Sequence, residues 1–303
     1  MLMSTVDRYL SLRRALGYKL RNTESHLRHF ARFSAKHGDS FLRSKTAIAF
    51  ALEASSTSQR DYIIRDIARF GLYAITEDAR HEIPPADMFR IHRPRPTPYI
   101  FSEHEIRLIM KHARRLGPEG SLRPHTYKTL IGLLASTGLR ISEAVSLNIS
   151  DFEQNALTIR QTKFQKNRLV PLHTTTLDAL NKYLVLRRQV EGTDPHLFVS
   201  MRRKKLCCGV VQQTFRKILS SAGIVENPEG PKPRLHSFRH TFAVRNLEKC
   251  RADRDSVTRH MIALSTYMGH SEVQSTYWYL ESTPSLLADI ADTCDDFLSG
   301  GDS

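Results

Sequence analysis

Residues 157–172 read LTIRQTKFQKNRLVPL, and this stretch decides what kind of fold the second half of the chain can have. Apolar and polar residues alternate over 157–161, and a period of two predicts a β-strand. A second strand over 168–172 follows a short polar turn, so the two predict a β-hairpin. The surrounding sequence has helical periodicity instead, at about 175–188, 209–222, 237–248, 255–267, 271–280 and 285–298. We therefore expect a mainly α fold with a small β-hairpin or sheet.

Residues 1–78 also show helical periodicity. In the segment 22–36 apolar side chains return to one helix face, and Gly38 follows as a stop signal. Another helix is predicted over residues 58–73. We expect four or so helices in this part, packed as a small bundle.

Proline marks the boundary between the two parts. The segment 79–98 contains Pro84, Pro85, Pro94, Pro96 and Pro98. Because proline lacks a backbone donor and disfavours helix in the residue before it, this composition predicts an extended linker. A new helix begins after it, since Ser102 and Glu105 fit a capping box. We assign residues 1–92 to a helical domain, 93–98 to the linker, and 99–303 to a mixed α+β domain with a C-terminal helix.

Charge indicates the class of partner. The 303 residues include 45 Lys and Arg against 31 Asp and Glu, a net charge of +14. Residues 1–92 carry 15 basic and 10 acidic residues and 93–303 carry 30 and 21, so both parts are basic. Such an excess points to a polyanion, either a nucleic acid or an anionic membrane surface.

Other classes are excluded by what the sequence lacks. No stretch approaches the roughly 20 apolar residues of a membrane span, and the N-terminus lacks the apolar core of a signal peptide. The four cysteines form no CxxC pair, which argues against a zinc ribbon or a disulfide scaffold. We expect a cytoplasmic protein with no membrane partner.

The segment 236–240, HSFRH, is a candidate phosphate site. His236 and Arg239 are three residues apart and share a helix face. His240 follows His236 at a spacing that also suits a zinc pair. However, no Glu lies between the histidines as a base, and Arg239 would place a positive charge beside the cation. A guanidinium and an imidazole on one face suit a phosphate instead.

The segment 137–143, TGLRISE, is a second candidate. Gly138 ends one helix and Arg140 opens the next, so an arginine meets a helix N-terminus. Glu143 lies one turn further on, where its carboxylate can hold the Arg140 guanidinium. Taken alone, the motif favours an ordinary surface Arg–Glu pair.

The hairpin carries a third candidate. Lys163 ends its first strand, and a lysine near a hairpin tip can swing into a neighbouring site. Lys166, in the same turn, is a rival for any such role.

The segment 267–279, YMGHSEVQSTYWY, is the fourth. Gly269 ends a helix and His270 lies at the entrance to the next, where an imidazole and free N–H groups favour an anion. Tyr277 and Tyr279 are two residues apart and face opposite ways on a helix, so at most one reaches a common site.

Two further basic groups are candidate DNA contacts. The first recurs every four residues on one helix face without an interleaved acidic residue, and consists of Arg28, Arg32 and Lys36. It fits a solvated face or a stripe that follows phosphates. The second suggests phosphate contact without base readout, and consists of Arg202, Arg203, Lys204 and Lys205.

Taken in chain order, the four motifs resemble the tyrosine recombinase (phage integrase-type) family. The resemblance covers nearly all of residues 100–283, and the helical first part resembles the family's core-binding domain, which has a SAM-like DNA-binding fold. The segment 264–280 looks like integrases borne on transposons and plasmids. The resemblance implies a two-domain, C-shaped clamp in which residues 99–303 are the catalytic domain.

The resemblance also implies roles for single residues. The positions that match the family's catalytic residues are Arg140, Lys163, His236, Arg239, His270 and Tyr279. It implies that Tyr279 attacks a DNA phosphodiester and forms a 3′-phosphotyrosine, with Lys163 donating a proton to the 5′-oxygen and His236 acting as general base or orienting the phenol. No cofactor or metal is required, because the arginines supply the positive charge.

The partners that the resemblance implies are double-stranded DNA, further copies of the chain in a tetrameric synapse, and in some systems partner recombinases. The C-terminal helix over 285–298 would dock into a neighbouring protomer through an apolar face made of Leu287, Ile290, Ala291, Cys294 and Leu298. Burial of that face against its own domain is the alternative.

The function we expect is site-specific recombination for the integration or excision of a mobile element. Two other functions stay open. A type IB topoisomerase-like nicking-closing enzyme would use the same chemistry, although two domains and 303 residues favour recombination. A catalytically silent DNA-binding accessory protein is the other, although all six matching positions are intact.

Overall fold

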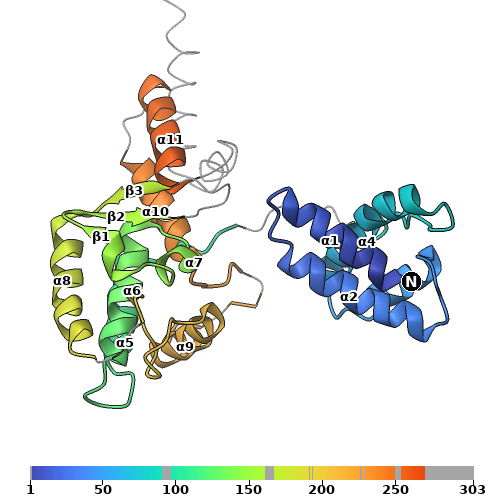
Figure 1. Cartoon of the computed structure of the whole chain (residues 1–303). Coiled ribbons are helices and arrows are strands. Elements are labelled where there is room, and N and C mark those ends of the chain that lie inside the picture. The colour runs from blue at the N-terminus through green and yellow to red at the C-terminus, as the bar shows by residue number, and fades with distance from the viewer. Residues whose placement is uncertain are drawn as a thin grey trace, which may run out of the picture. The chain divides into compact units, whose positions relative to one another are not determined.

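The computed structural model describes residues 2–90, 97–160, 167–190, 192, 194–225, 227–228, 230–249 and 254–269. The chain divides into two compact units, residues 1–95 and 96–303 (Figure 1). Helices predominate in both, and a small antiparallel sheet lies in the second, so the expected mainly α fold class is confirmed. Among these residues, no helix is long and apolar enough to cross a membrane.

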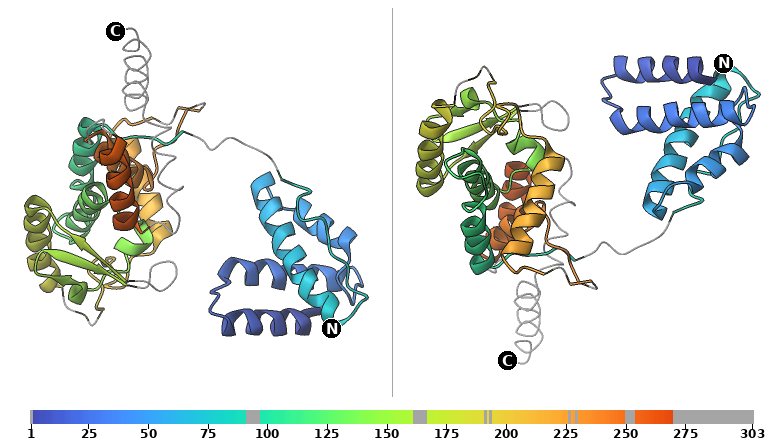
Figure 2. Two further views of the ribbon diagram at one scale, coloured as in Figure 1. Left: turned by 90° about the horizontal axis from the view of Figure 1, so that it is seen from above. Right: turned by 90° about the horizontal axis from the view of Figure 1, so that it is seen from below.

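The first unit is built from helices packed around one apolar core. In residues 2–90 they are α1 (Leu2–Ala15), α2 (Arg21–Lys36), α3 (Ser44–Leu52) and α4 (Thr57–Glu77). Helices α1 and α2 lie side by side (Figure 2), and Phe30, Ile64 and Phe70 are fully buried between the helices. The helix predicted over 22–36 is confirmed. The one predicted over 58–73 is longer at both ends, and the hydroxyl of Ser56 caps its start.

Part of the segment expected to be a linker belongs to the first unit. His81 is buried, and its Nδ1 accepts a hydrogen bond from the backbone N–H of Leu42 at 2.9 Å. The carboxylate of Glu82 accepts from the backbone N–H of Ser44 at 2.8 Å and from Arg43 at 2.9 Å. These contacts supply acceptors to the loop before α3, so the chain as far as Glu82 is packed and is not an extended connection.

The second unit contains most of the elements. They are α5 (Glu103–Ala113), α6 (Arg123–Thr137), α7 (Ile141–Ala144), η1 (Ile149–Asp151), β1 (Phe152–Glu153), β2 (Ala156–Ile159), β3 (Arg168–Pro171), α8 (Thr174–Arg188), α9 (Cys208–Ser221), α10 (Ser237–Glu248) and α11 (Arg254–Met268). Helix α6 packs against α5, α8 and α10 (Figure 1). The predicted helices that correspond to α8, α9, α10 and α11 are confirmed within a residue or so, whereas those predicted over 271–280 and 285–298 lie outside the described residues.

The sheet has the strand order β1-β2-β3, and both pairings are antiparallel. Strands β2 and β3 are the predicted hairpin, with Ile159 opposite Arg168. Leu157, Ile159 and Val170 are buried, which is the alternation that the sequence predicted. Strand β1 was not predicted, because two residues are too few to show a period.

The start of the second unit is fastened to α10. Ser102 and Glu105 form the predicted capping box: the Ser102 hydroxyl accepts from Glu105 N at 3.1 Å, and the Glu105 carboxylate accepts from Ser102 N at 2.8 Å. The preceding residue, Phe101, is fully buried. Its backbone N–H donates to the Thr241 hydroxyl and its carbonyl accepts from Arg245, both at 2.9 Å.

Candidate active site

Arg239 is held between the ends of two helices. It lies on α10 and is only 2% exposed. One terminal nitrogen, Nη1, donates to the Gly138 carbonyl at the end of α6 at 2.8 Å, and Nη2 donates to the Met268 carbonyl at the end of α11 at 2.7 Å. Carbonyls at helix C-termini lack intrahelical donors and carry partial negative charge, so a guanidinium satisfies both. Arg239 therefore joins α6, α10 and α11.

The turn from α6 into the TGLRISE motif depends on Gly138. Its φ of 61° is left-handed, and a Cβ at this position would lie 2.6 Å from Cδ1 of Phe242 on α10. Both the backbone conformation and the close approach of α10 require glycine. The predicted helix end at Gly138 is confirmed, and the turn leads directly to Arg140.

Arg140 is the residue before α7, and Glu143 holds it in two ways. The carboxylate accepts from Arg140 Nη1 and from the Arg140 backbone N–H, both at 2.9 Å. The interaction that the sequence suggested between the two residues is therefore present. The other terminal nitrogen of Arg140 donates to the Gly269 carbonyl at 3.4 Å.

Glu143 has a second cationic partner, Arg168, that the sequence analysis missed. Arg168 is the first residue of β3 and makes a bidentate pair with the same carboxylate, at 3.1 and 2.9 Å. Burial raises the pKa of Glu143, but the hydrogen bonds and charge of Arg168, aided by Arg140, outweigh it and hold that pKa below its ordinary value. The carboxylate is thus ionised. Nothing local in the sequence signals a contact between residues 25 apart.

Three arginines therefore meet at the end of α11. Arg239 and Arg140 bind the carbonyls of Met268 and Gly269, which are consecutive residues. Gly269 has a left-handed φ of 65°, and a Cβ there would lie 2.7 Å from Arg168 Nη1. All three guanidinium groups lie against the same short piece of backbone.

His236 precedes α10 and is exposed. Its ring centroid lies 4.6 Å from that of His240, with the ring planes at 88°. His236 is thus the N-cap residue of α10, and Arg239 lies in the first turn of that helix. In the described part of the chain, no group of three or more His, Cys, Asp or Glu side chains is arranged to hold a metal ion.

Several predicted site residues lie outside the described residues. They are Lys163, Lys166, His270, Tyr277 and Tyr279, together with the apolar face over 285–298. Lys163 falls in the connection between Ile159 and Arg168, which pair in the hairpin. His270 follows Gly269 directly in the sequence. The structure thus brings Arg140 and Arg239 together, and the roles assigned to all six catalytic positions stay predictions.

Arg28, in the predicted basic stripe on α2, is paired with two carboxylates. Its guanidinium pairs with Glu24 at 3.1 Å and with Asp7 of α1 at 2.8 Å. The sequence analysis overlooked Glu24, which lies one turn earlier on the same face, and could not foresee Asp7. Arg32 and Lys36 are exposed, and neither forms an ion pair with any other described residue. Phosphate contact by Arg28, Arg32 and Lys36 stays a prediction.

The basic run 202–205 forms a tight turn. Val199 and Lys205 pair across it, and Arg203 has a left-handed φ of 58°. All four basic residues are exposed, and the Lys205 ammonium donates to the Ser146 hydroxyl at 2.7 Å. The exposure of the four cations is compatible with the predicted phosphate contact.

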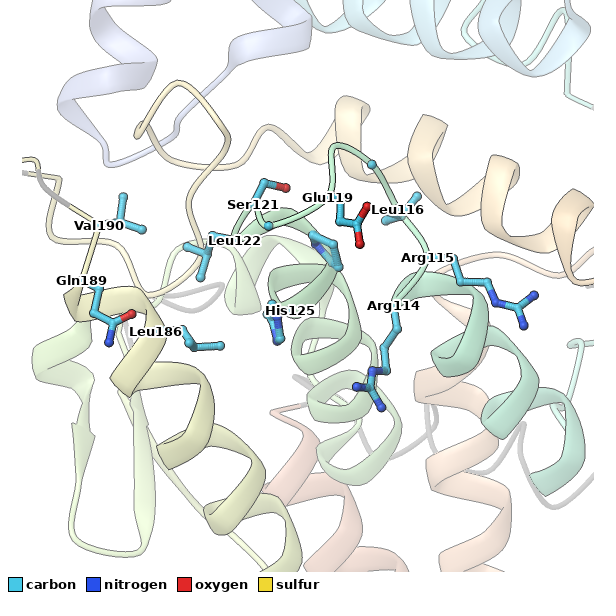
Figure 3. A pocket seen from close by; sticks show the side chains of 13 residues that line it. Arg114, Arg115, Leu116, Glu119, Ser121, Leu122, His125, Leu186, Gln189 and Val190 are labelled. Atoms are coloured by element: carbon cyan, nitrogen blue, oxygen red, sulfur yellow. The ribbon is translucent and has the colours of Figure 1, made fainter.

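A separate cavity of about 530 Å³ lies at the C-terminal ends of α5 and α8 and at the start of α6 (Figure 3). Arg114, His125 and Gln189 are among its lining residues. None of the three clustered arginines lines it, so this cavity is not part of the candidate site.

Both the sequence and the fold of this chain are similar to those of known proteins. The model of the phage integrase family matches residues 100–285. An integrase/recombinase of Sinorhizobium fredii, y4rB, is 35% identical over 292 residues, which cover 93% of either chain. The fold is similar to that of XerH site-specific recombinase in a post-cleavage complex with its difH substrate, with a TM-score of 0.65, 18% identity, and coverage of 90% of this chain and 79% of that one. It is also similar to lambda integrase in a tetramer bound to a Holliday junction, with a TM-score of 0.64, 20% identity, and coverage of 92% and 76%.

Proposed function

Because the chain belongs to the phage integrase family of tyrosine recombinases, which cut and rejoin DNA strands, we propose that it is a site-specific recombinase that acts through a 3′-phosphotyrosine. We propose further that it integrates or excises a mobile element. The similarity of the segment 264–280 to integrases of transposons and plasmids supports this biological role.

The observation that carries the proposal is the meeting of Arg140 and Arg239 at consecutive carbonyls of Met268 and Gly269. The two arginines come from motifs far apart in the sequence. Gly138, which belongs to the motif of Arg140, is 101 residues from Arg239. Cations fixed in place before the reaction stabilise the charge that develops on phosphoryl oxygens without reorganising. His270, the third group proposed to stabilise the phosphoryl oxygens, follows Gly269 directly in the sequence.

The proposed reaction proceeds by one displacement at phosphorus. The Tyr279 oxygen forms a bond to the phosphorus, the bond from phosphorus to the 5′-oxygen breaks, and the tyrosine stays on the 3′-phosphate. The phenol proton passes to His236, and Lys163 gives a proton to the departing 5′-oxygen. A second DNA strand reverses these steps with its own 5′-hydroxyl. Arg140, Arg239 and His270 stabilise the phosphoryl oxygens, so no step of the proposed reaction requires a metal or nucleotide.

The test of the nucleophile is the covalent adduct on a nicked suicide substrate. Tyr279→Phe should abolish the adduct and leave the DNA dissociation constant unchanged. Tyr277→Phe is the matched control and should keep the adduct. If the adduct survives Tyr279→Phe and disappears with Tyr277→Phe, the register of the nucleophile is wrong. An adduct without strand exchange between two duplexes would favour the nicking-closing activity.

The proton donor has its own test. Lys163→Ala should slow cleavage by about 10²–10⁴-fold, the usual scale for losing a general acid. A 5′-phosphorothiolate substrate has a leaving group that needs little protonation, so it should restore the rate. Lys166→Ala is the control, and a larger defect there, or no rescue of Lys163→Ala, moves the role elsewhere.

We propose double-stranded DNA and further copies of this chain as the partners. The net charge of +14 supports the first. The tetramer in which lambda integrase binds a Holliday junction supports the second. We propose that the helix over 285–298 docks into a neighbouring protomer. Deletion of 285–303 should then give a folded monomer that binds DNA but forms no synaptic complex, whereas an insoluble product would indicate burial in its own domain.

A further inference from the structure

The Glu143 carboxylate is shared between two arginines from different parts of the second unit. It accepts from Arg140 Nη1 at 2.9 Å and from both terminal nitrogens of Arg168 at 3.1 and 2.9 Å. The side chains of Glu143 and Arg168 are 9% and 12% exposed, whereas that of Arg140 is 32% exposed. Arg168 is therefore the inner partner, and Arg140 is the one that faces solvent and any bound phosphate.

The second arginine on Glu143 also sets the net charge at the site. A carboxylate that fixes Arg140 also cancels its charge, and a neutral pair attracts a phosphate poorly. With Arg168 on the same carboxylate, the group of Arg140, Glu143 and Arg168 keeps one net positive charge. Glu143 can then hold Arg140 in one geometry while the cluster stays cationic.

Arg168 also links two segments that carry proposed catalytic groups. As the first residue of β3 it pairs with Ile159, so it closes the hairpin connection in which Lys163 lies. Its guanidinium fills the space beside Gly269, where a Cβ would come within 2.7 Å of Nη1. The end of α11, directly before His270, therefore rests on Arg168.

We propose that Arg168 is a positioning residue for strand cleavage. Through Glu143 it fixes the Arg140 guanidinium and keeps the cluster cationic, and through Gly269 it fixes the end of α11 relative to the hairpin. This inference rests on the proposed function, because it assumes that Arg140 binds the scissile phosphate.

Arg187 provides a matched control. It is 4% exposed and lies on α8, where its Nη2 donates to the carbonyls of Asp194 and His196 at 2.8 and 3.1 Å. Among the described residues, the Nε atoms of Arg187 and Arg168 are both buried without a hydrogen-bond partner. Unlike Arg168, Arg187 has no carboxylate partner in this part of the chain.

The test compares Arg168→Gln, Arg187→Gln and Arg140→Ala in the full chain, on suicide substrates with either a normal or a methylphosphonate group at the scissile position. The methylphosphonate is neutral, so it does not need the charge of Arg140. We expect Arg168→Gln to slow cleavage of the normal phosphate by about 10²-fold, the effect of a misplacement near 1 Å. The DNA dissociation constant should be unchanged. On the neutral phosphate the defects of Arg168→Gln and Arg140→Ala should both shrink, whereas any defect of Arg187→Gln should be equal on the two substrates.

If Arg168→Gln slows cleavage of both substrates by the same factor, Arg168 has only a structural role and the inference is overturned. If Arg140→Ala cleaves the normal phosphate at the wild-type rate, the proposed site itself is wrong. If Arg168→Gln does not fold, Arg168→Lys tests the positioning role alone, because lysine keeps the charge and loses the bidentate pair. A substrate-independent defect in Arg168→Lys would overturn the inference in the same way.

Discussion

Arg239→Lys tests how far the fold depends on the forked shape of one buried side chain. The two terminal nitrogens of Arg239 bind the Gly138 and Met268 carbonyls at 2.8 and 2.7 Å, in surroundings that leave the residue 2% exposed. A lysine ammonium keeps the charge but is a point donor, so it cannot span both carbonyls. One buried carbonyl then loses its partner, which costs about 1–3 kcal/mol.

We therefore expect Arg239→Lys to lower the free energy of unfolding of the second unit by about 1–3 kcal/mol, a large share of the 5–15 kcal/mol typical of folded domains. Urea unfolding of the full chain, followed by circular dichroism, measures the change. Arg234→Lys is the control, because Arg234 is exposed just before the same helix and should change stability by less than about 0.5 kcal/mol. If Arg239→Lys costs no more than this control, the two carbonyl bonds do not stabilise the unit as argued.

Three further predictions concern other positions. Gly138→Ala places a Cβ on a left-handed backbone and against Phe242. The free energy of unfolding, measured by differential scanning calorimetry, should therefore fall by about 2–5 kcal/mol. Burial lowers the pKa of His81 from its ordinary 6.5, so the unfolded state binds more protons and stability should fall as the pH drops below about 6.5. Thermal unfolding from pH 7.5 to 5 should show a smaller decline in His81→Gln. Ser102→Ala removes the N-cap of α5, so the free energy of unfolding measured in urea should fall by about 1 kcal/mol.

The sequence predicted those parts of the fold that local spacing determines. The alternation of apolar and polar residues over 157–161 and 168–172 correctly predicted β2 and β3, because every second side chain of a half-buried strand must be apolar. Ser102 and Glu105 predicted the start of α5 for a similar reason, since a capping box involves residues only three apart.

Contacts between distant segments could not be predicted in this way. In the sequence, Arg168 has no feature that distinguishes it from an ordinary polar residue at the start of a strand. Its pairing with Glu143 depends on how the hairpin packs against α7. Arg28 illustrates the same limit on a surface helix, because one of its carboxylate partners, Asp7, lies on a different helix. The resemblance to the recombinase family identified Arg140 and Arg239 as a set, but only the fold places them at neighbouring carbonyls.

The fastening of Phe101 has a mechanical consequence. Both of its backbone groups are bonded to side chains of α10, so a pull along the chain from the first unit reaches α10 before it reaches α5. The same helix carries Arg239, whose guanidinium spans the ends of α6 and α11. Tension in the connecting segment is therefore delivered to the arginine at which three helices meet.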